Sequence, residues 1–144
     1  MQTFLPEEDF YKTAQSLDRQ RLGKQRVETL QIAGVVAGIK DGWKNHPAVK
    51  MWMNYPQTLL EYQRAIVGEW LDRGYKDTCW EKTVDLLAPI KQLSLPWWIG
   101  NDEFHLSHRS NLVRKNPEHY GSFWPDVDDT LEYKWPSSNE GAWL

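Results

Sequence analysis

Apolar side chains recur every three or four residues between Pro56 and Gly74, which is the spacing of one face of an α-helix. Proline suits the first turn of a helix, and glycine is typical of the position just after the last turn. The residues that define this face are Leu59, Leu60, Gln63, Ile66, Val67, Trp70 and Leu71. The stretch therefore predicts a core helix.

The rest of the chain before residue 124 also carries helix signals, and alternating strand patterns are scarce. Pro6 followed by three acidic residues predicts a helix start, and Gly23 predicts a bend or a change of helix. A second helix is predicted by an apolar face made of Val27, Leu30, Gly34 and Ala37. Further helices are expected over Ala48 to Asn54, from Asp77 or Thr78 to Leu87, from Asn101 to Lys115 and from Pro117.

We therefore expect an all-α protein with a single compact helical domain. Its 144 residues suit one domain, which we assign to residues 1–124. Residues 125–144 are acidic, contain Pro136 and have no helical pattern. We expect this irregular tail to pack on the domain, with Trp135 and Trp143 as anchors.

Several classes of protein are disfavoured by the composition. No apolar run approaches the roughly 18 residues needed to cross a bilayer, and no basic, apolar leader opens the chain. We expect a cytoplasmic monomer without a membrane partner. Cys79 is the single cysteine, so neither an internal disulfide nor a cysteine zinc site is expected. No glycine-rich phosphate loop is present, and we expect neither a metal nor another cofactor.

Charge is distributed unevenly along the chain, although the net charge is only −3. Residues 12–124 carry sixteen Lys and Arg against twelve acids, whereas both ends are acidic. A basic central body can hold a polyanion such as DNA, because the field at a surface depends on where the charges lie. Scattered surface charge is the alternative interpretation.

The most highly charged stretch lies between residues 18 and 28. On a continuous helix Arg21, Lys24 and Glu28 share one face, and Gln25 lies beside them. The cations of this stretch are Arg19, Arg21, Lys24 and Arg26. Such a ridge suits successive phosphates, and a carboxylate among cations stays ionised and is available as a base or as a partner for a cationic intermediate. A solvated helix face, with Glu28 paired to Lys24, is the alternative.

A second polar cluster contains His105, Ser107, His108 and Arg109, with Lys115 nearby. The two histidines have ligand-like spacing, but no third ligand accompanies them, which disfavours a metal site. Ser107 and His108 are sequence neighbours that point about 100° apart on a helix, which disfavours a nucleophile pair. Arg109 and Lys115 are either anion contacts or solvated charges.

These residues also carry a family resemblance. Leu17-x-x-Gln20-x-Leu22, with Glu28 six residues further on, resembles the catalytic helix of the pyrimidine dimer DNA glycosylases, the endonuclease V type of UV-repair enzyme. The stretch from Val49 to Thr78 resembles that family's long middle helix and its exit. The stretch from Leu106 to Phe123 resembles its carboxy-terminal helix and aromatic segment.

The resemblance implies an all-helical DNA-repair glycosylase with abasic-site lyase activity and no cofactor, acting on double-stranded DNA that contains a lesion. It implies that the α-amine of Met1 displaces the damaged base and that Glu28 assists. An α-amine suits this task because its unperturbed pKa lies near 8, against about 10.4 for a lysine side chain. The resemblance also implies a phosphate-contacting group at Arg19, Arg21, Lys24 and Arg26. We further expect Gln2, Arg109 and Lys115 to bind DNA.

One departure from the family concerns the second residue. Characterised members expose a small residue, typically threonine, after the initiator methionine is removed, whereas the bulky Gln2 favours retention of Met1. Met1 then supplies the amine. The alternatives are Lys24 as the nucleophile, Glu28 as the activator of water in a glycosylase without strand cleavage, or a non-catalytic helical module that binds nucleic acid or protein.

Overall fold

The computed structural model describes residues 1–144 and consists of helices without any strand. Its only ladder-like pairing is an isolated bridge between Pro136 and Trp143. The helices are α1 (Phe10–Ser16), α2 (Arg19–Val36), α3 (Pro47–Lys50), α4 (Pro56–Asp72), α5 (Trp80–Leu87), α6 (Asp102–Lys115) and α7 (Pro117–Phe123). The prediction of an all-α fold is confirmed. None of these helices combines the length and the apolar character needed to cross a bilayer.

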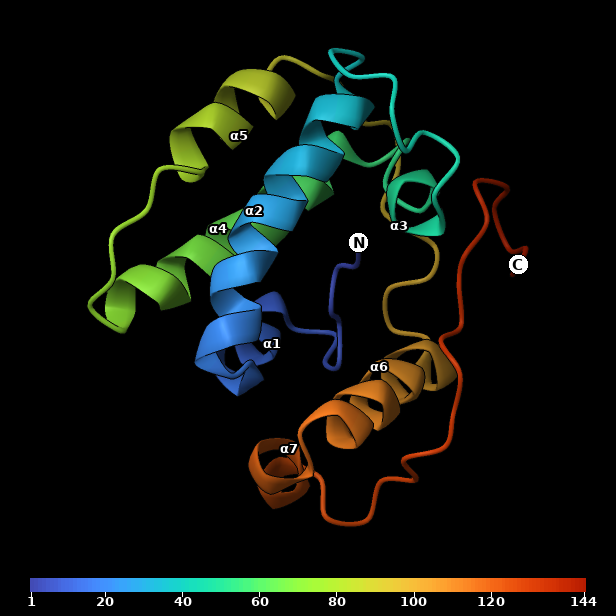
Figure 1. Ribbon diagram of the computed structural model, residues 1–144. Coiled ribbons are helices and arrows are strands. Elements are labelled where there is room, and N and C mark those ends of the chain that lie inside the picture. Colours follow the sequence, from blue (N-terminus) through green and yellow to red (C-terminus); the bar gives the residue numbers. More distant parts are fainter.

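Two groups of helices lie on either side of the amino-terminal segment (Figure 1). In the first group, α2 packs on α4, α5 packs against both of them, and α1 packs against α4. The second group consists of α6 and α7, which pack on each other. Residues 1–6 run between the two groups, as the dark blue segment of Figure 1 shows. This placement brings the first residues of the chain into contact with helices from both groups.

Aromatic rings fill the core between these helices. Trp52, Tyr62 and Trp98 are fully buried, and the rings of Trp52 and Trp98 meet edge to face with centroids 5.0 Å apart. Edge-to-face contacts of this kind add to the stabilisation that burial of the rings provides. Many of the chain's tryptophans therefore serve the core, and the adjacent pair is divided, since Trp98 is buried and Trp97 only partly so.

The start of the first helices differs from the prediction. Residues 1–9 are not helical, and α1 begins at Phe10 with the side chain of Asp9 accepting hydrogen bonds from the first turn. The chain changes helix at Leu17 and Asp18 rather than at Gly23, which lies inside α2. A Cβ atom at Gly23 would stand 2.9 Å from the ring of Trp70. Glycine occupies this position because α2 approaches Trp70 closely, not because the helix bends.

The predicted apolar face of α2 is wrong at Val27, although Gly34 is buried as expected. Val27 is 43% exposed, whereas the residues that face the core include Leu22, Gln25, Thr29 and Ile32. Two of these four are polar, so the apolar spacing that the sequence offers points to the wrong side of the helix. Gln25, which was expected beside the cationic ridge, is buried.

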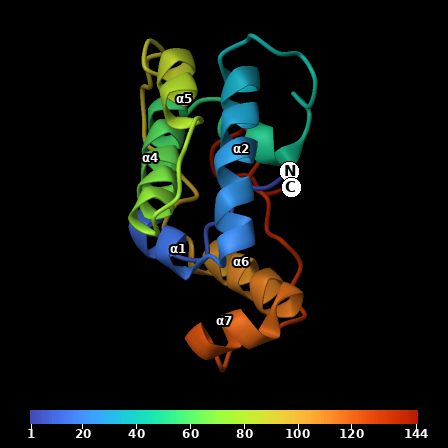
Figure 2. The same cartoon turned by 60° about the vertical axis from the view of Figure 1, so that its left-hand side comes forward.

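The tail over residues 125–144 crosses α6 as an irregular chain (Figure 2). The side chains of Ser107, Ser110 and Asn111 form hydrogen bonds with its backbone. Trp135 and Trp143 are partly buried against the core, and Trp143 meets Trp97 with ring centroids 4.8 Å apart. These contacts fit the expected role of both residues as anchors.

Candidate active site

The first residues of the chain form an extended segment that is buried without a strand partner. Residues 2–6 are all buried. An extended backbone inside a helical protein has no neighbouring strand to satisfy its N–H and C=O groups, and leaving them unpaired is costly. Polar side chains from α2, α4 and α6 take the place of that missing strand.

Gln25 on α2 supplies two of these contacts. Its Nε2 donates to the carbonyl of Gln2 at 2.8 Å, and its Oε1 accepts from the amide of Phe4 at 3.0 Å. The hydroxyl of Tyr62 on α4 donates to the carbonyl of Phe4 at 2.5 Å. Together these side chains fix both the position and the direction of the segment.

Two histidines of α6 hold the next residue. Nδ1 of His108 accepts from the amide of Leu5 at 2.9 Å, and Nδ1 of His105 donates to the Leu5 carbonyl at 2.8 Å. Nε2 of His105 in turn accepts from the amide of Gly100, which fixes its neutral tautomer. Burial lowers the pKa of His108 to about 3, so this ring is neutral. The histidine pair is thus a clamp for the backbone, with both Nδ1 atoms engaged by Leu5.

A cleft of about 710 Å³ opens where this segment begins. Inside it, the backbone amide of Gln2 donates to Oε2 of Glu28 at 3.3 Å. Nζ of Lys24 lies 3.8 Å from Oε1 of the same carboxylate, whose side chain is only 15% exposed. Met1 lines the cleft, and its α-amine forms no ion pair within 4.0 Å. The remaining lining residues are Phe4, Gln20, Arg21, His46, Lys115, Tyr133 and Trp135.

His46 is a residue of this cleft that the sequence did not single out. Its Nδ1 accepts from the amide of Ala48 at 3.0 Å and thereby caps α3, which leaves Nε2 as the protonated nitrogen of the neutral ring. Burial lowers the pKa of His46, and the charge of the amino terminus lowers it further, while Glu28 acts in the opposite direction. The amino terminus and Glu28 are therefore both close enough to act on one imidazole. The only sequence signal for His46 is its position directly before Pro47, which opens α3.

The predicted DNA-binding residues divide into two sets. Gln2, Arg21, Lys24 and Lys115 line the cleft, and Lys115 joins it from α6, far along the chain. Arg19 is exposed at the start of α2 but is not among the lining residues. The cleft therefore has three cationic side chains around one carboxylate.

Arg26 and Arg109 are engaged elsewhere. Nη1 of Arg26 lies 2.6 Å from Oδ1 of Asp77, and its guanidinium lies 4.4 Å from the centre of the Trp70 ring. Nη1 of Arg109 donates to the carbonyl of Pro6 at 2.7 Å, so this arginine extends the clamp on the amino-terminal segment. Both side chains have structural partners within the protein, and neither lines the cleft.

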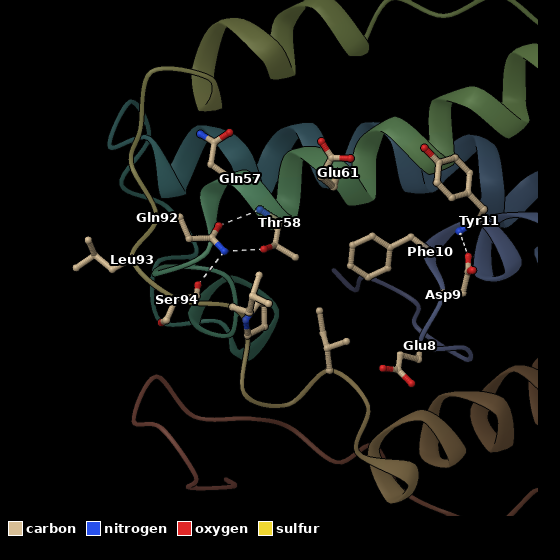
Figure 3. A pocket seen from close by; sticks show the side chains of 13 residues that line it. Glu8, Asp9, Phe10, Tyr11, Gln57, Thr58, Glu61, Gln92, Leu93 and Ser94 are labelled. Atoms are coloured by element: carbon tan, nitrogen blue, oxygen red, sulfur yellow. Dashed lines mark hydrogen bonds between the residues drawn. The ribbon is translucent and has the colours of Figure 1, made fainter.

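A second, larger recess of about 850 Å³ lies apart from this cleft and shares none of its residues (Figure 3). Its walls include Glu8, Asp9 and Glu61 and no Lys or Arg. In Figure 3 the side chain of Gln92 reaches Thr58, and it holds the loop that closes one side of the recess. An acidic recess repels phosphate, so its size alone does not make it a nucleic-acid site.

Comparison with known protein families gives one match. Residues 1–82 fit the family model described as pyrimidine dimer DNA glycosylase. The matched part of the chain contains Met1, Lys24, Glu28 and His46, whereas Lys115 and the tail lie beyond it. No curated protein and no solved structure shows a significant match to the chain.

Proposed function

The chain belongs to the pyrimidine dimer DNA glycosylase family, and on this premise we propose that it excises dimerised pyrimidines from double-stranded DNA through the α-amine of Met1. The observation that carries the proposal is the hydrogen bond of 3.3 Å between the amide of Gln2 and Glu28. This bond holds the residue next to the amine against the one carboxylate of the cleft. Met1 and Glu28 thus line the same cleft of about 710 Å³.

The first step is a displacement at the sugar of the damaged nucleotide. The neutral amine attacks C1′, the glycosidic bond breaks, and its electron pair goes to the base, which takes up the proton that the amine loses and stays joined to its partner base through the dimer. The C1′–O4′ bond then breaks, O4′ takes up a proton, and a protonated imine forms between the amine nitrogen and C1′. No carboxylate lies within 4.0 Å of this amine, so its nitrogen is not held in an ion pair.

Glu28 stabilises the positive charge of the imine in the second step. Its side chain is only 15% exposed, so water screens its charge poorly and the electrostatic effect is strong. The same carboxylate is suited to accept the C2′ proton, after which the electron pair of that C–H bond expels the 3′ phosphate. This β-elimination is the proposed abasic-site lyase activity.

Arg21, Lys24 and Lys115 provide the contacts to the DNA backbone. They surround the cleft from α2 and α6, so a strand that enters the cleft meets cations on two sides. Arg19 adds an exposed cation at the start of α2. The substrate must present the damaged sugar to a recessed amine, which requires a bent duplex with a nucleotide turned out of the stack. We propose that the protein acts as a monomer.

Borohydride trapping tests the proposal. A duplex with a single cyclobutane thymine dimer is incubated with the protein and borohydride, which reduces the imine to a stable covalent adduct. We expect an adduct with this duplex and none with an undamaged duplex of the same sequence. Cleavage of the glycosidic bond without an adduct would instead favour Glu28 as the activator of water, and neither cleavage nor adduct would favour a non-catalytic DNA-binding module.

A further inference from the structure

The loop between α2 and α3 extends away from the helices on the same side as the amino terminus (Figure 2). It spans residues 37–46 and carries two large apolar side chains in water: Ile39 is 71% exposed and Trp43 is 67% exposed. Most large rings of this protein are wholly or partly buried in the core. An indole that remains in water on a protruding loop is therefore a departure from the use of tryptophan in the rest of the chain.

The backbone holds Trp43 in an unfavourable conformation. Its φ of 69° lies in the left-handed region, and it is the only residue other than glycine with a positive φ. Bulky side chains rarely adopt this conformation, and residues that do so cluster at functional sites. A glycine at position 43 would adopt this conformation without such strain. The indole itself gains little burial from the strained conformation, because it remains 67% exposed.

A chain of ring contacts connects Trp43 to the proposed active site. The amide of His46 donates to the carbonyl of Trp43 at 2.8 Å, and the two rings meet edge to face with centroids 6.0 Å apart. The ring of His46 also meets the ring of Trp135 edge to face, with centroids 6.2 Å apart. Since His46 and Trp135 both line the cleft, Trp43 lies at its rim.

The charges of the loop favour a nucleic acid over a protein as the partner of this ring. Lys40 and Lys44 are both exposed and lie on either side of Trp43 in the sequence, against a single acid, Asp41. A flat aromatic surface between cations suits a nucleobase whose phosphates lie on either side, because bases stack on aromatic rings whatever their sequence.

We propose that Trp43 stacks on the bases next to the lesion and fills the gap that a nucleotide leaves when it turns out into the cleft. The proposal rests on the proposed function, since it assigns the loop at residues 37–46 to the same DNA site. The ligand is an interrupted base stack in a duplex. The loop thus holds the duplex open while the amine and Glu28 act on the extruded sugar.

Binding to a duplex with a stable gap tests this proposal without any catalysis. The probe is a fluorescein-labelled duplex with one tetrahydrofuran abasic analogue, which has no base to release and no C1′ hydroxyl to form an imine. We expect the protein to bind this duplex about tenfold more tightly than the intact duplex, as measured by fluorescence anisotropy. Trp43→Ala should reduce the preference to about one, because a stacked base contributes roughly a tenfold or larger effect.

Two variants serve as controls. Trp43→Phe retains a ring and should keep most of the preference, whereas Tyr11→Ala removes an exposed ring beside the acidic recess and should change nothing. An unchanged preference in Trp43→Ala, or no preference in the unmodified protein, would overturn the proposal. If borohydride traps no adduct but the binding preference is lost in Trp43→Ala as expected, the chemistry proposed for Met1 is overturned and the stacking site is retained.

Discussion

The two recesses of this protein differ in charge, and the difference is more informative than their size. The larger recess, about 850 Å³, has three carboxylates and no Lys or Arg in its walls. The smaller cleft, about 710 Å³, has three cationic side chains around Glu28. Only the second can accept a phosphate backbone, because a polyanion is bound through neutralisation of its charge.

The two sites also share a way of being held in place. In the cleft, the amide of Gln25 fixes the amino-terminal segment. In the acidic recess, the amide of Gln92 fixes a loop by contacts with Thr58, as Figure 3 shows. A glutamine side chain can satisfy a donor and an acceptor at once, which makes it a substitute for a neighbouring strand. What distinguishes the cleft is that its clamped segment begins with a primary amine.

The largest expected difference between the two recesses is the effect on the excision rate of removing a carboxylate charge from each. Glu28→Gln should reduce the rate of excision by roughly 10²–10³-fold, the range found when a group that stabilises developing charge is removed. Single-turnover kinetics on the dimer-containing duplex measures this rate. The matched variant is Glu61→Gln at the acidic recess, which should excise at the normal rate. Equal rates for the parent and Glu28→Gln would remove the role assigned to this carboxylate.

Disruption of the two clamps should affect stability unequally. Gln25→Leu leaves the carbonyl of Gln2 and the amide of Phe4 buried without partners, which we expect to cost about 3 kcal/mol in the free energy of unfolding. Gln92→Leu should cost less than about 1 kcal/mol, because water can replace its partly exposed contacts. Urea denaturation provides both values. If Gln25 also positions the amino-terminal segment for catalysis, the Gln25→Leu variant should excise more slowly than the parent even without urea, where both proteins are folded.

Acid should weaken the amino-terminal clamp. His108 is neutral in the folded protein with a pKa of about 3, whereas an unfolded histidine titrates near 6.5, so the unfolded chain binds more protons between these values. Stability should therefore fall as the pH falls from 6.5 toward 3, by at most about 1.4 kcal/mol per pH unit from this residue. Urea denaturation at pH 6.5 and pH 5.5 measures the slope. His108→Gln, which retains an acceptor for the amide of Leu5, should have a smaller slope, and an identical slope would contradict this origin.

The smallest effects concern the charges at the rims of the two recesses. Lys115→Ala should weaken DNA binding modestly and reduce the slope of log affinity against log salt by about 1, as expected for one lost phosphate contact. Glu8→Ala at the acidic recess should leave that slope unchanged. Anisotropy titrations of both variants with an undamaged duplex measure this slope. A salt range of roughly 50 to 200 mM is wide enough to resolve the difference. A smaller slope in both variants would show that the recesses do not differ in their contact with DNA.

The sequence predicts the helices better than the faces they bury. α4 and α6 follow from apolar spacing, Pro56 and the cap at Asn101, all of which are local signals. The buried face of α2 was mispredicted because Gln25 and Thr29 occupy core positions. Gln25 is buried because it holds the amino-terminal segment, more than twenty residues away, and Thr29 accepts a hydrogen bond from Gln25.

The candidate site was predictable where its residues are close in the sequence. Arg21, Lys24 and Glu28 share one helix face, so their spacing alone brings them together. Arg26 and Arg109 were grouped with them because of their charge, yet their partners are Asp77 and Pro6, at separations of 51 and 103 residues. Such pairings depend on the assembled fold, and local spacing does not encode them. His46 and Tyr133 reach the cleft in the same way.

Mass-spectrometric mapping of the borohydride adduct tests the central claim most directly. Intact mass first shows whether the native protein retains Met1, and digestion of the trapped complex then locates the modified nitrogen. We predict that the reduced sugar is attached to the α-nitrogen of Met1 and that acetylation of the amino terminus abolishes the adduct. Attachment to the side chain of Lys24, or an undiminished adduct with the acetylated protein, would contradict the account.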